Sequence, residues 1–298
     1  MLPETFVLPI IVNPVAGASR ALEAAQELRR QLERRHFRQS RVQIVWKPED
    51  VATAASEAVK AGAPVVAIAG GDGTLQWAAR ALAGTTTALA VVAAGRGNDL
   101  ALALSIPRDA AELARLVFAM STRTIDVGQV DERPFLTVAS CGFDSEVAAI
   151  VYRRGVSGSG RSVYVMATLK ALRRFRPVRV KLEGDFGTHE SLVTLVATAN
   201  TRSYGGGMLI APEADPCDGS FDVVVIGRMG RLGILRTLRR VYSGRHVRDS
   251  RVSVLRTKRL SIEADRPLLM YADGEPCGQT PATLELRPRA LRVIAPTA

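Results

Sequence analysis

The sequence predicts an α/β domain with a parallel sheet, followed by a mainly antiparallel β domain. Its 298 residues correspond to about two domains of ordinary size. Over residues 1–127, short apolar runs alternate with segments of helical periodicity, whereas from about residue 128 most apolar segments are separated by turns. No low-complexity linker lies between these parts, so we place the domain boundary where the periodicity changes.

The first domain is expected to alternate strands and helices. Its strands are apolar throughout, without polar alternation, which is typical of a parallel sheet covered on both faces. The first expected helix shows the spacing of an amphipathic helix, with Leu22, Ala25, Leu28 and Leu32 on one face. The expected strands cover residues 7–12, 42–46, 65–69 and 89–93, and the expected helices cover residues 21–35, 51–61 and 75–82.

The second domain, residues 128–287, is expected to consist mainly of strands joined by turns. Two helices, over residues 161–175 and 231–242, interrupt it and carry much of its positive charge. A C-terminal segment, about residues 288–298, is expected to return to the first domain. The expected strands cover residues 135–139, 178–182, 192–199, 221–226, 252–255, 260–264, 284–286 and 291–294.

Composition excludes several classes of protein. Hydrophobic residues make up 47% of the chain, so it can bury a sizeable core and is not disordered as a whole. No apolar run reaches the ~18–20 residues that span a bilayer, and no signal peptide is apparent. The three cysteines are far apart in the sequence, which suits neither a disulfide framework nor a zinc site. We therefore expect a cytoplasmic protein.

Positive charge is concentrated in the second half of the chain. The net charge is +11, yet the first 150 residues carry 15 Lys/Arg against 16 Asp/Glu, and the remainder carries 25 against 13. This excess suits an anionic membrane surface, a nucleic acid or a polyphosphate ligand, and a solvated basic face without a partner is the alternative. Nucleic acid is not expected, because no aromatic residues are interleaved with the basic runs for base stacking.

Residues 231–242 predict an amphipathic basic helix. Apolar side chains recur at helical spacing, and arginines occupy the other positions of the helical wheel. Such a helix can lie on anionic lipid headgroups. The alternative is that its apolar stripe packs on the protein's own sheet. The apolar positions are Leu232, Leu235, Leu238 and Tyr242, and the arginines are Arg231, Arg236, Arg239 and Arg240.

Three strands of the first domain are followed by loops that contain glycine. The loops cover residues 13–17, 70–74 and 95–99. Open α/β sheets bind ligands at the carboxyl ends of their strands. Glycine lets the backbone approach a phosphate, and amides at a helix N-terminus attract anions. The loops therefore predict a phosphate-binding rim, although their spacing is neither that of a Walker A loop nor GxGxxG.

In this order, NPVAG at 13–17, GGDGT at 70–74 and GRGND at 95–99 resemble the diacylglycerol kinase catalytic domain, which bacterial lipid kinases share with sphingosine and ceramide kinases. The resemblance continues through CGFDSEV at 141–147, the glycine-rich segment 205–223 and ADGE at 272–275. NAD kinases and phosphofructokinases carry loops similar to GGDGT, but the ordered set is specific. The resemblance implies an α/β nucleotide-binding domain and a β-sandwich lipid-substrate domain.

The resemblance implies ATP-dependent phosphorylation of a lipid alcohol such as diacylglycerol, with Mg²⁺ offsetting the phosphate charge. It also implies an anionic membrane surface as a peripheral partner, and the sequence leaves the oligomeric state open, a homodimer included. Asp72 would organise Mg²⁺ through water, and Asp99 and Asp144 would complete the acidic network. The residues implied in nucleotide binding are Asn13, Pro14, Gly17, Lys47, Gly70, Gly71, Asp72, Gly73, Thr74, Gln76, Arg96, Asn98 and Asp99.

Asp273 takes the family's position for the general base that accepts the hydroxyl proton. An Asp-Gly pair is also typical of a tight turn, which is the alternative for this residue. Asp215, Asp218 and Ser220 align with a second, structural Mg²⁺ site of the family. The pair Asp218-Gly219 is equally consistent with a hairpin turn, and Asp144 with the cap of a helix over residues 145–150.

The chain departs from the family pattern at several nucleotide-site positions. Arg96, Ala93 and Gln76 stand where the family usually has Thr, Pro and Asn, and Lys47 stands where a Thr often contacts nucleotide. The two cations could pair with triphosphate oxygens or block adenosine binding. Two further functions therefore stay open: an NAD kinase-like nucleotide kinase, and a catalytically silent lipid-binding or regulatory protein.

Overall fold

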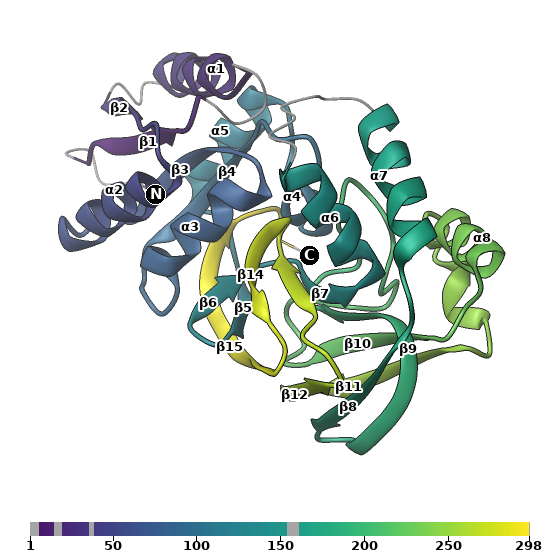
Figure 1. Cartoon of the computed structure of the whole chain (residues 1–298). Coiled ribbons are helices and arrows are strands. Elements are labelled where there is room, and N and C mark those ends of the chain that lie inside the picture. Colours follow the sequence, from purple (N-terminus) through teal and green to yellow (C-terminus); the bar gives the residue numbers. More distant parts are fainter. Residues whose placement is uncertain (1–5, 15–19, 36–38, 154–160, 298) are drawn as a thin grey trace. The chain divides into compact units, whose positions relative to one another are not determined.

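The computed structural model describes residues 6–14, 20–35, 39–153 and 161–297 (Figure 1). The chain folds as two compact units. The N-terminal unit comprises Met1–Val127 and Arg287–Ala298, and the C-terminal unit comprises Gly128–Leu286. The chain passes between the units twice, once within strand β5 (Thr122–Val130) and once within strand β15 (Ala282–Ile294).

The N-terminal unit is built on a parallel sheet in the order β2-β1-β3-β4-β15. Its strands β3 and β4 are buried along almost their whole length, as expected where helices cover both faces. The C-terminal part of β15 lies parallel to β4, with Val293 beside Leu89. The first four strands are β1 (Leu8–Val12), β2 (Ser40–Ile44), β3 (Val65–Gly70) and β4 (Ala88–Ala93).

Helices cover both faces of this sheet (Figure 1). On one face, α1 (Arg20–Arg34) packs beside α5 (Ala110–Ala119), and on the other α2 (Pro48–Lys60) packs beside α3 (Asp72–Leu82). Neither α5 nor the short α4 (Asp99–Ala103) is among the helices predicted from the sequence. The start of α5 has a sequence signal, because Asp109 accepts the Glu112 N–H at 2.8 Å as an N-cap.

The C-terminal unit is a mainly antiparallel β structure. Its strands follow the order β14-β13-β7-β9-β8-β12, and β10 lies between β9 and β11. Every strand pair in this list is antiparallel. The strands are β6 (Arg133–Phe135), β7 (Val138–Gly142), β8 (Val178–Gly184), β9 (Gly187–Ala199), β10 (Phe221–Gly227), β11 (Val252–Thr257), β12 (Arg259–Ala264), β13 (Leu269–Ala272) and β14 (Glu275–Gln279).

Alternate residues of β10 enter two separate hydrophobic cores, as the side-chain period of a strand requires. Phe221 and Val223 belong to the core between the strands, where the Phe221 ring stacks on Phe135 at 5.6 Å. Val224 and Ile226 belong to a second core. Three helices contribute to that second core, namely α6 (Phe143–Arg153), α7 (Arg161–Arg174) and α8 (Arg231–Val241).

The predicted fold class is confirmed, and three element predictions need correction. Residues 135–139 are not one strand, because the Leu136 and Thr137 amides donate to the Asp273 carboxylate and separate β6 from β7. Residues 284–286 and 291–294 belong to a single strand, β15. The helix expected over residues 145–150 begins at Phe143, which places Asp144 in its first turn rather than before it.

Candidate active site

Two glycine turns of the N-terminal unit pack backbone against backbone. Gly71 follows β3 and caps the start of α3, and Gly95 follows β4. A Cβ built on Gly95 would lie 2.4 Å from the Gly71 Cα, a distance that no side chain tolerates. The Gly95 N–H also donates to the Gly70 carbonyl at 3.1 Å. The two turns therefore form one backbone surface at the carboxyl ends of β3 and β4.

Asn98 closes the second of these turns. Its Oδ1 accepts the Gly95 N–H at 2.8 Å, and its Nδ2 donates to the Gly95 carbonyl at 2.9 Å. The side chain is buried, and its φ of 55° lies in the left-handed region that asparagine tolerates. Asn98 thereby fixes the loop that precedes α4.

Asp72 links α3 to the start of α4. Its Oδ1 accepts the Leu100 N–H at 3.3 Å. Burial raises the pKa of this carboxyl and the nearby Asp99 raises it further, whereas backbone N–H groups at the start of α4 act in the opposite direction. Gly71 supplies no side-chain cap to α3, so this helix N-terminus has the character of an anion site.

The remaining residues predicted to bind nucleotide divide into buried and exposed groups. Asn13 is buried at the end of β1, where its N–H donates to the Ala69 carbonyl at 3.3 Å, and Pro14 follows it. Thr74 and Gln76 are buried on α3, and Gly73 lies in its first turn. Lys47, which precedes α2, and Arg96 are exposed. Gly17 lies outside the described residues.

In the C-terminal unit, Asp273 occupies a tight turn and also has a fixed carboxylate. Asp273 and Gly274 have φ values of 50° and 83°, as in a type I′ hairpin, and join β13 to β14. The Leu136 N–H donates to Oδ2 at 2.7 Å, and the Thr137 N–H and Oγ1 donate to Oδ1 at 2.8 and 2.5 Å. The carboxylate is therefore held in one orientation.

A second carboxylate, Asp144, is half-buried in the first turn of α6. Tyr204 Oη donates to its Oδ2 at 3.0 Å, and the Ser145 N–H donates to its Oδ1 at 2.7 Å. Burial raises the pKa of Asp144, and hydrogen bonds from Ser140, Tyr204 and Ser145 oppose that rise. Tyr204 is not among the site residues predicted from the sequence, although it directly precedes the glycine triplet 205–207. Thr137 is not among them either, because it carries no local sequence signal.

Asp215, Asp218 and Ser220 lie together in the turn before β10. The Ser220 N–H donates to Asp218 Oδ1 at 3.0 Å, and Arg256 forms an ion pair with Asp218 Oδ2. Carboxylate and hydroxyl oxygens are ligands that Mg²⁺ accepts, but a cation at Oδ2 competes with the Arg256 guanidinium. Among the described residues, no group of three or more His, Cys, Asp or Glu side chains is placed to hold a metal ion. The magnesium site stays a prediction.

The chain matches known proteins over nearly its whole length. Residues 8–130 match the model of the diacylglycerol kinase catalytic domain, and residues 137–295 match the YegS C-terminal NAD kinase beta sandwich-like domain. A diacylglycerol kinase of Mycobacterium tuberculosis is 36% identical over 295 residues, which cover 96% of this chain and 94% of that protein. A diacylglycerol kinase of Bacillus subtilis is 27% identical over 290 residues, covering 96% and 95%.

A Pseudomonas putida protein named "Probable lipid kinase YegS-like" is 29% identical over 257 residues, covering 86% of this chain and 85% of that protein. A crystal structure of a diacylglycerol kinase from Bacillus anthracis has a TM-score of 0.73 at 20% identity, with 97% of each chain covered. This structural likeness concerns the fold. The chain therefore belongs to the family of the diacylglycerol kinase catalytic domain, a family of phosphotransferases, and its second half is of the YegS β-sandwich-like type.

Proposed function

We propose that the protein is an ATP-dependent lipid kinase that phosphorylates the hydroxyl group of a membrane lipid alcohol such as diacylglycerol. The relatives named diacylglycerol kinase support this substrate class. The observation that carries the proposal is the backbone surface formed by Gly71 and Gly95, because this surface lies at the N-terminus of α3, where main-chain N–H groups favour a phosphate.

The nucleotide phosphates would lie at the 70–74 turn, where the N-terminus of α3 favours negative charge. Asn13 and Asn98 would frame this position from the neighbouring strand ends. Arg96 and Lys47 are exposed, so their cationic groups are able to move toward triphosphate oxygens when nucleotide binds. We propose that both cations act as ligands of the phosphates rather than as obstacles.

Mg²⁺ fits the chemistry of the N-terminal unit. Asp99 lies close enough to Asp72 to raise the pKa of the Asp72 carboxyl, and a cation beside them would offset that repulsion. When bound, Mg²⁺ would neutralise charge on the transferring phosphate. Asp215, Asp218 and Ser220 would hold a second, structural Mg²⁺, provided that Arg256 releases the Asp218 carboxylate.

Asp273 would act as the general base. In the proposed transfer, the lipid hydroxyl oxygen forms a bond to the γ-phosphorus, the bond from that phosphorus to the bridging oxygen breaks, and ADP leaves. The hydroxyl proton passes to the Asp273 carboxylate. The three hydrogen bonds from Leu136 and Thr137 fix the carboxylate before the hydroxyl arrives, which removes the cost of orienting it during the reaction.

Labelled ATP offered to the purified full-length chain with Mg²⁺ tests this function. Separate reactions contain diacylglycerol, a sphingoid base, a total lipid extract or NAD. We expect label in a lipid product. Label in NAD alone would make the protein an NAD kinase-like nucleotide kinase. The absence of transfer to every acceptor would favour a catalytically silent lipid-binding or regulatory protein.

The acceptor of such a kinase lies in a membrane, and we propose that the protein reaches it as a peripheral protein on the cytoplasmic face of an anionic bilayer. None of the helices in the described part of the chain has the length and apolar character of a membrane-spanning segment. Peripheral binding needs a surface that combines positive charge with exposed apolar side chains.

A further inference from the structure

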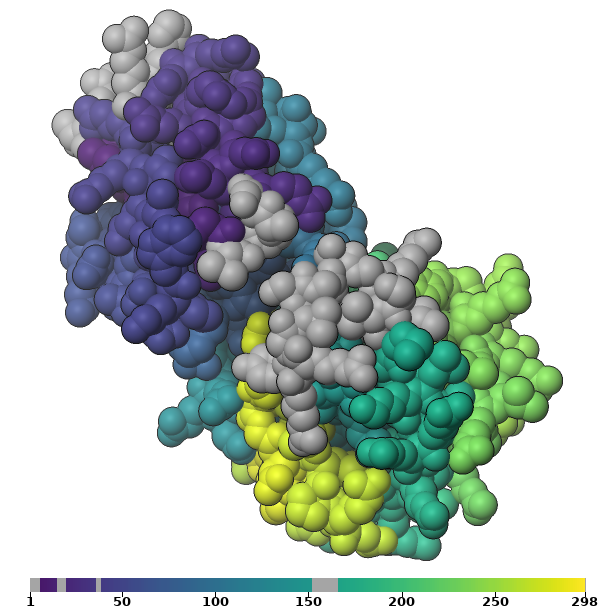
Figure 2. All heavy atoms as spheres, turned by 45° about the horizontal axis from the view of Figure 1, so that its top comes forward, coloured from purple at the N-terminus to yellow at the C-terminus, as the bar shows by residue number. Residues whose placement is uncertain are grey.

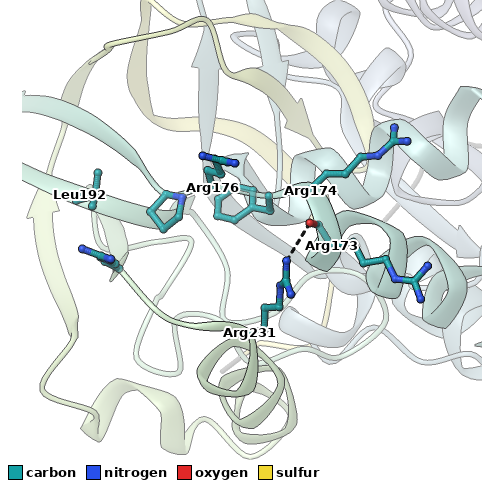
Figure 3. A pocket seen from close by; sticks show the side chains of 8 residues that line it. Arg173, Arg174, Arg176, Leu192 and Arg231 are labelled. Carbon is teal, nitrogen blue, oxygen red and sulfur yellow. Dashed lines mark hydrogen bonds between the residues drawn. The ribbon is translucent and has the colours of Figure 1, made fainter.

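Two hollows on the surface of the C-terminal unit are lined by arginines. The first measures about 510 Å³, and Figure 3 shows its side chains. Arg231 donates to the Arg173 carbonyl at 3.2 Å, while the side chains of Arg173 and Arg174 point away from Leu192 (Figure 3). These cations diverge, so they do not form a binding site for one anion.

The second hollow is more uniform in its chemistry. It measures about 590 Å³ and is lined by five arginines and one serine, without a carboxylate. The arginines belong to α8 and to the short helix η1 (Arg245–Arg248) that follows it, and the serine lies in the turn between the two helices. We call this the α8–η1 hollow. Its lining residues are Arg236, Arg239, Arg240, Ser243, Arg245 and Arg248.

The charge of the α8–η1 hollow is not balanced by the protein. Arg240 lies 3.6 Å from Asp249, but that carboxylate already accepts two hydrogen bonds of 2.8 Å from Arg251. These contacts lower the pKa of Asp249 to about 2, so it remains ionised and bound to Arg251. The other four arginines of the hollow form no ion pair with any residue in the described part of the chain. An external anion would therefore find unmatched cations here.

Helix α8 also exposes apolar side chains. The helix packs on the unit through Ile234 and Val241, which are buried. Leu232, Leu235 and Tyr242 are exposed by 71%, 38% and 59% of their surface. The alternative that the apolar stripe packs on the protein's own sheet is therefore wrong for these three residues. In Figure 2 the light-green segment that contains α8 and η1 lies at the surface.

The exposed surface of α8 carries apolar and cationic side chains next to one another. Residues three, four and seven apart share one face of a helix, so Arg239 lies between Leu232 and Leu235. Arg236, Arg239 and Arg240 also line the hollow, whose lining continues into η1. Exposed apolar side chains next to cations match the boundary of a bilayer, where phosphate groups lie next to acyl chains.

We propose that the α8–η1 hollow binds the phosphate group of an anionic phospholipid, and that Leu232, Leu235 and Tyr242 enter the bilayer beside it. A guanidinium group can donate two parallel hydrogen bonds to the oxygens of one phosphate group. Arginines around a hollow can direct such hydrogen bonds toward the same phosphate. The volume of the hollow lies within the usual range of ligand sites. This inference rests on the proposed function as a lipid kinase, and it identifies the part of the protein that contacts the membrane.

Vesicle co-sedimentation of the full-length chain without nucleotide tests this surface. The vesicles contain phosphatidylcholine alone or with about 30% phosphatidylglycerol. The variant R236Q/R239Q/R248Q removes three cations from the hollow, and R174Q/R176Q/R228Q removes three exposed cations from the divergent cluster as a matched control. A cation near an anionic surface contributes about 1 kcal/mol, or about fivefold in binding, so we expect the hollow variant to lose ~100-fold. The loss of vesicle binding in the control variant should be at least tenfold smaller than the loss in the hollow variant.

Equal losses in both triple variants would overturn the proposal, because binding would then follow net charge alone. A failure of the wild-type chain to sediment with anionic vesicles would overturn it as well. The variant L232S/L235S keeps every charge and should lose at least fivefold in vesicle binding. Unchanged binding of this variant would show that these apolar side chains do not enter the bilayer.

Glycerol 3-phosphate separates a lipid headgroup from a soluble phosphate ester. We expect it to bind to the wild-type chain in the millimolar range or more weakly, and vesicles to bind far more tightly. Tight binding of the soluble ester, lost in R236Q/R239Q/R248Q, would make the hollow a site for a soluble ligand and contradict the lipid proposal. None of these measurements depends on phosphate transfer. Their results therefore test membrane binding independently of the result of the kinase assay.

Discussion

Thr137 donates two hydrogen bonds to one carboxylate oxygen of Asp273, from its backbone N–H at 2.8 Å and from its hydroxyl at 2.5 Å. The two residues are 136 positions apart in the chain. Thr137 lies between β6 and β7, and Asp273 lies in the turn between β13 and β14. The orientation of the proposed base is thus set by a residue remote from it in sequence.

Thr137→Val removes one of these donors with little change in volume. We expect kcat to fall about tenfold, because a hydrogen bond to a charged group is worth ~1.5–3 kcal/mol, while the KM for ATP stays within about twofold. Steady-state kinetics measures both constants. Thr198→Val is the matched control, since Thr198 is buried and its hydroxyl has no hydrogen-bond partner. A similar loss of kcat in both variants would contradict a role for Thr137 in positioning Asp273.

Asp273→Asn keeps the shape of the side chain and removes its ability to accept the hydroxyl proton. We expect turnover to fall by at least ~100-fold, the lower range for general-base catalysis, with nucleotide affinity unchanged. Stability should fall by ~1–3 kcal/mol, because charged hydrogen bonds to Leu136 and Thr137 are lost. Calorimetric ATP binding and denaturant unfolding separate the two effects. Wild-type turnover in a folded variant would exclude Asp273 as the base.

Gly95→Ala forces a Cβ to within 2.4 Å of the Gly71 Cα. The β3 and β4 turns would have to separate, so we expect nucleotide affinity to fall at least tenfold and stability to fall by ~1–3 kcal/mol. Equilibrium ATP binding and thermal unfolding report these changes. Gly230→Ala is the control, because nothing lies within 4 Å of its Cβ position and its φ is −72°. Unimpaired ATP binding by Gly95→Ala would show that these turns are not part of the nucleotide site.

Asp144→Asn should stabilise the protein increasingly as the pH rises. Burial raises the folded-state pKa of Asp144 above its ordinary value of 3.8, so the folded chain binds the proton more tightly than the unfolded chain. Its contribution to stability is therefore complete below pH 3.8 and is lost as the pH rises through the folded-state pKa. Urea unfolding of both proteins from about pH 4 to 8 measures this difference. A difference that does not vary with pH would show that Asp144 is not desolvated in solution.

Mg²⁺ should stabilise the wild-type protein through Asp218. If the Kd is about 1 mM, about 10 mM Mg²⁺ adds ~1.4 kcal/mol to the free energy of unfolding. Thermal unfolding with Mg²⁺ and with a chelator measures this increment. Asp218→Asn should abolish it, and Arg256→Gln should increase it, because the competing guanidinium is gone. A stability increment that persists in Asp218→Asn would show that Mg²⁺ binds elsewhere. The absence of an increment in the wild type would support the alternative that Asp218 and Gly219 form only a hairpin turn.

The first half of the fold is predictable because its elements leave periodic patterns. Buried parallel strands appear as continuous apolar runs, and α1 buries Ala25, Leu28 and Leu32 at helical spacing. The five-residue α4 is too short to show a helical period. The break in the strand predicted over residues 135–139 depends on the Asp273 carboxylate, which no local pattern near Leu136 records.

The candidate site also contains features that the sequence predicts and features that it does not. The glycine turns are visible in the sequence because close backbone approach at Gly71 and Gly95 demands residues without side chains. The partners of the carboxylates are not visible, because they come from distant parts of the chain. Tyr204 lies 60 residues after Asp144, which it contacts, and only the folded C-terminal unit brings them together.

The parallel sheet of the N-terminal unit is completed by β15, the last strand of the chain. During synthesis on the ribosome, β4 therefore presents an unpaired edge until β15 emerges, although the strands on its other side are already available. An apolar edge of this kind invites pairing with another nascent chain. Production of the protein should consequently be sensitive to chaperone supply, and truncation before residue 287 should yield aggregates rather than a smaller folded protein.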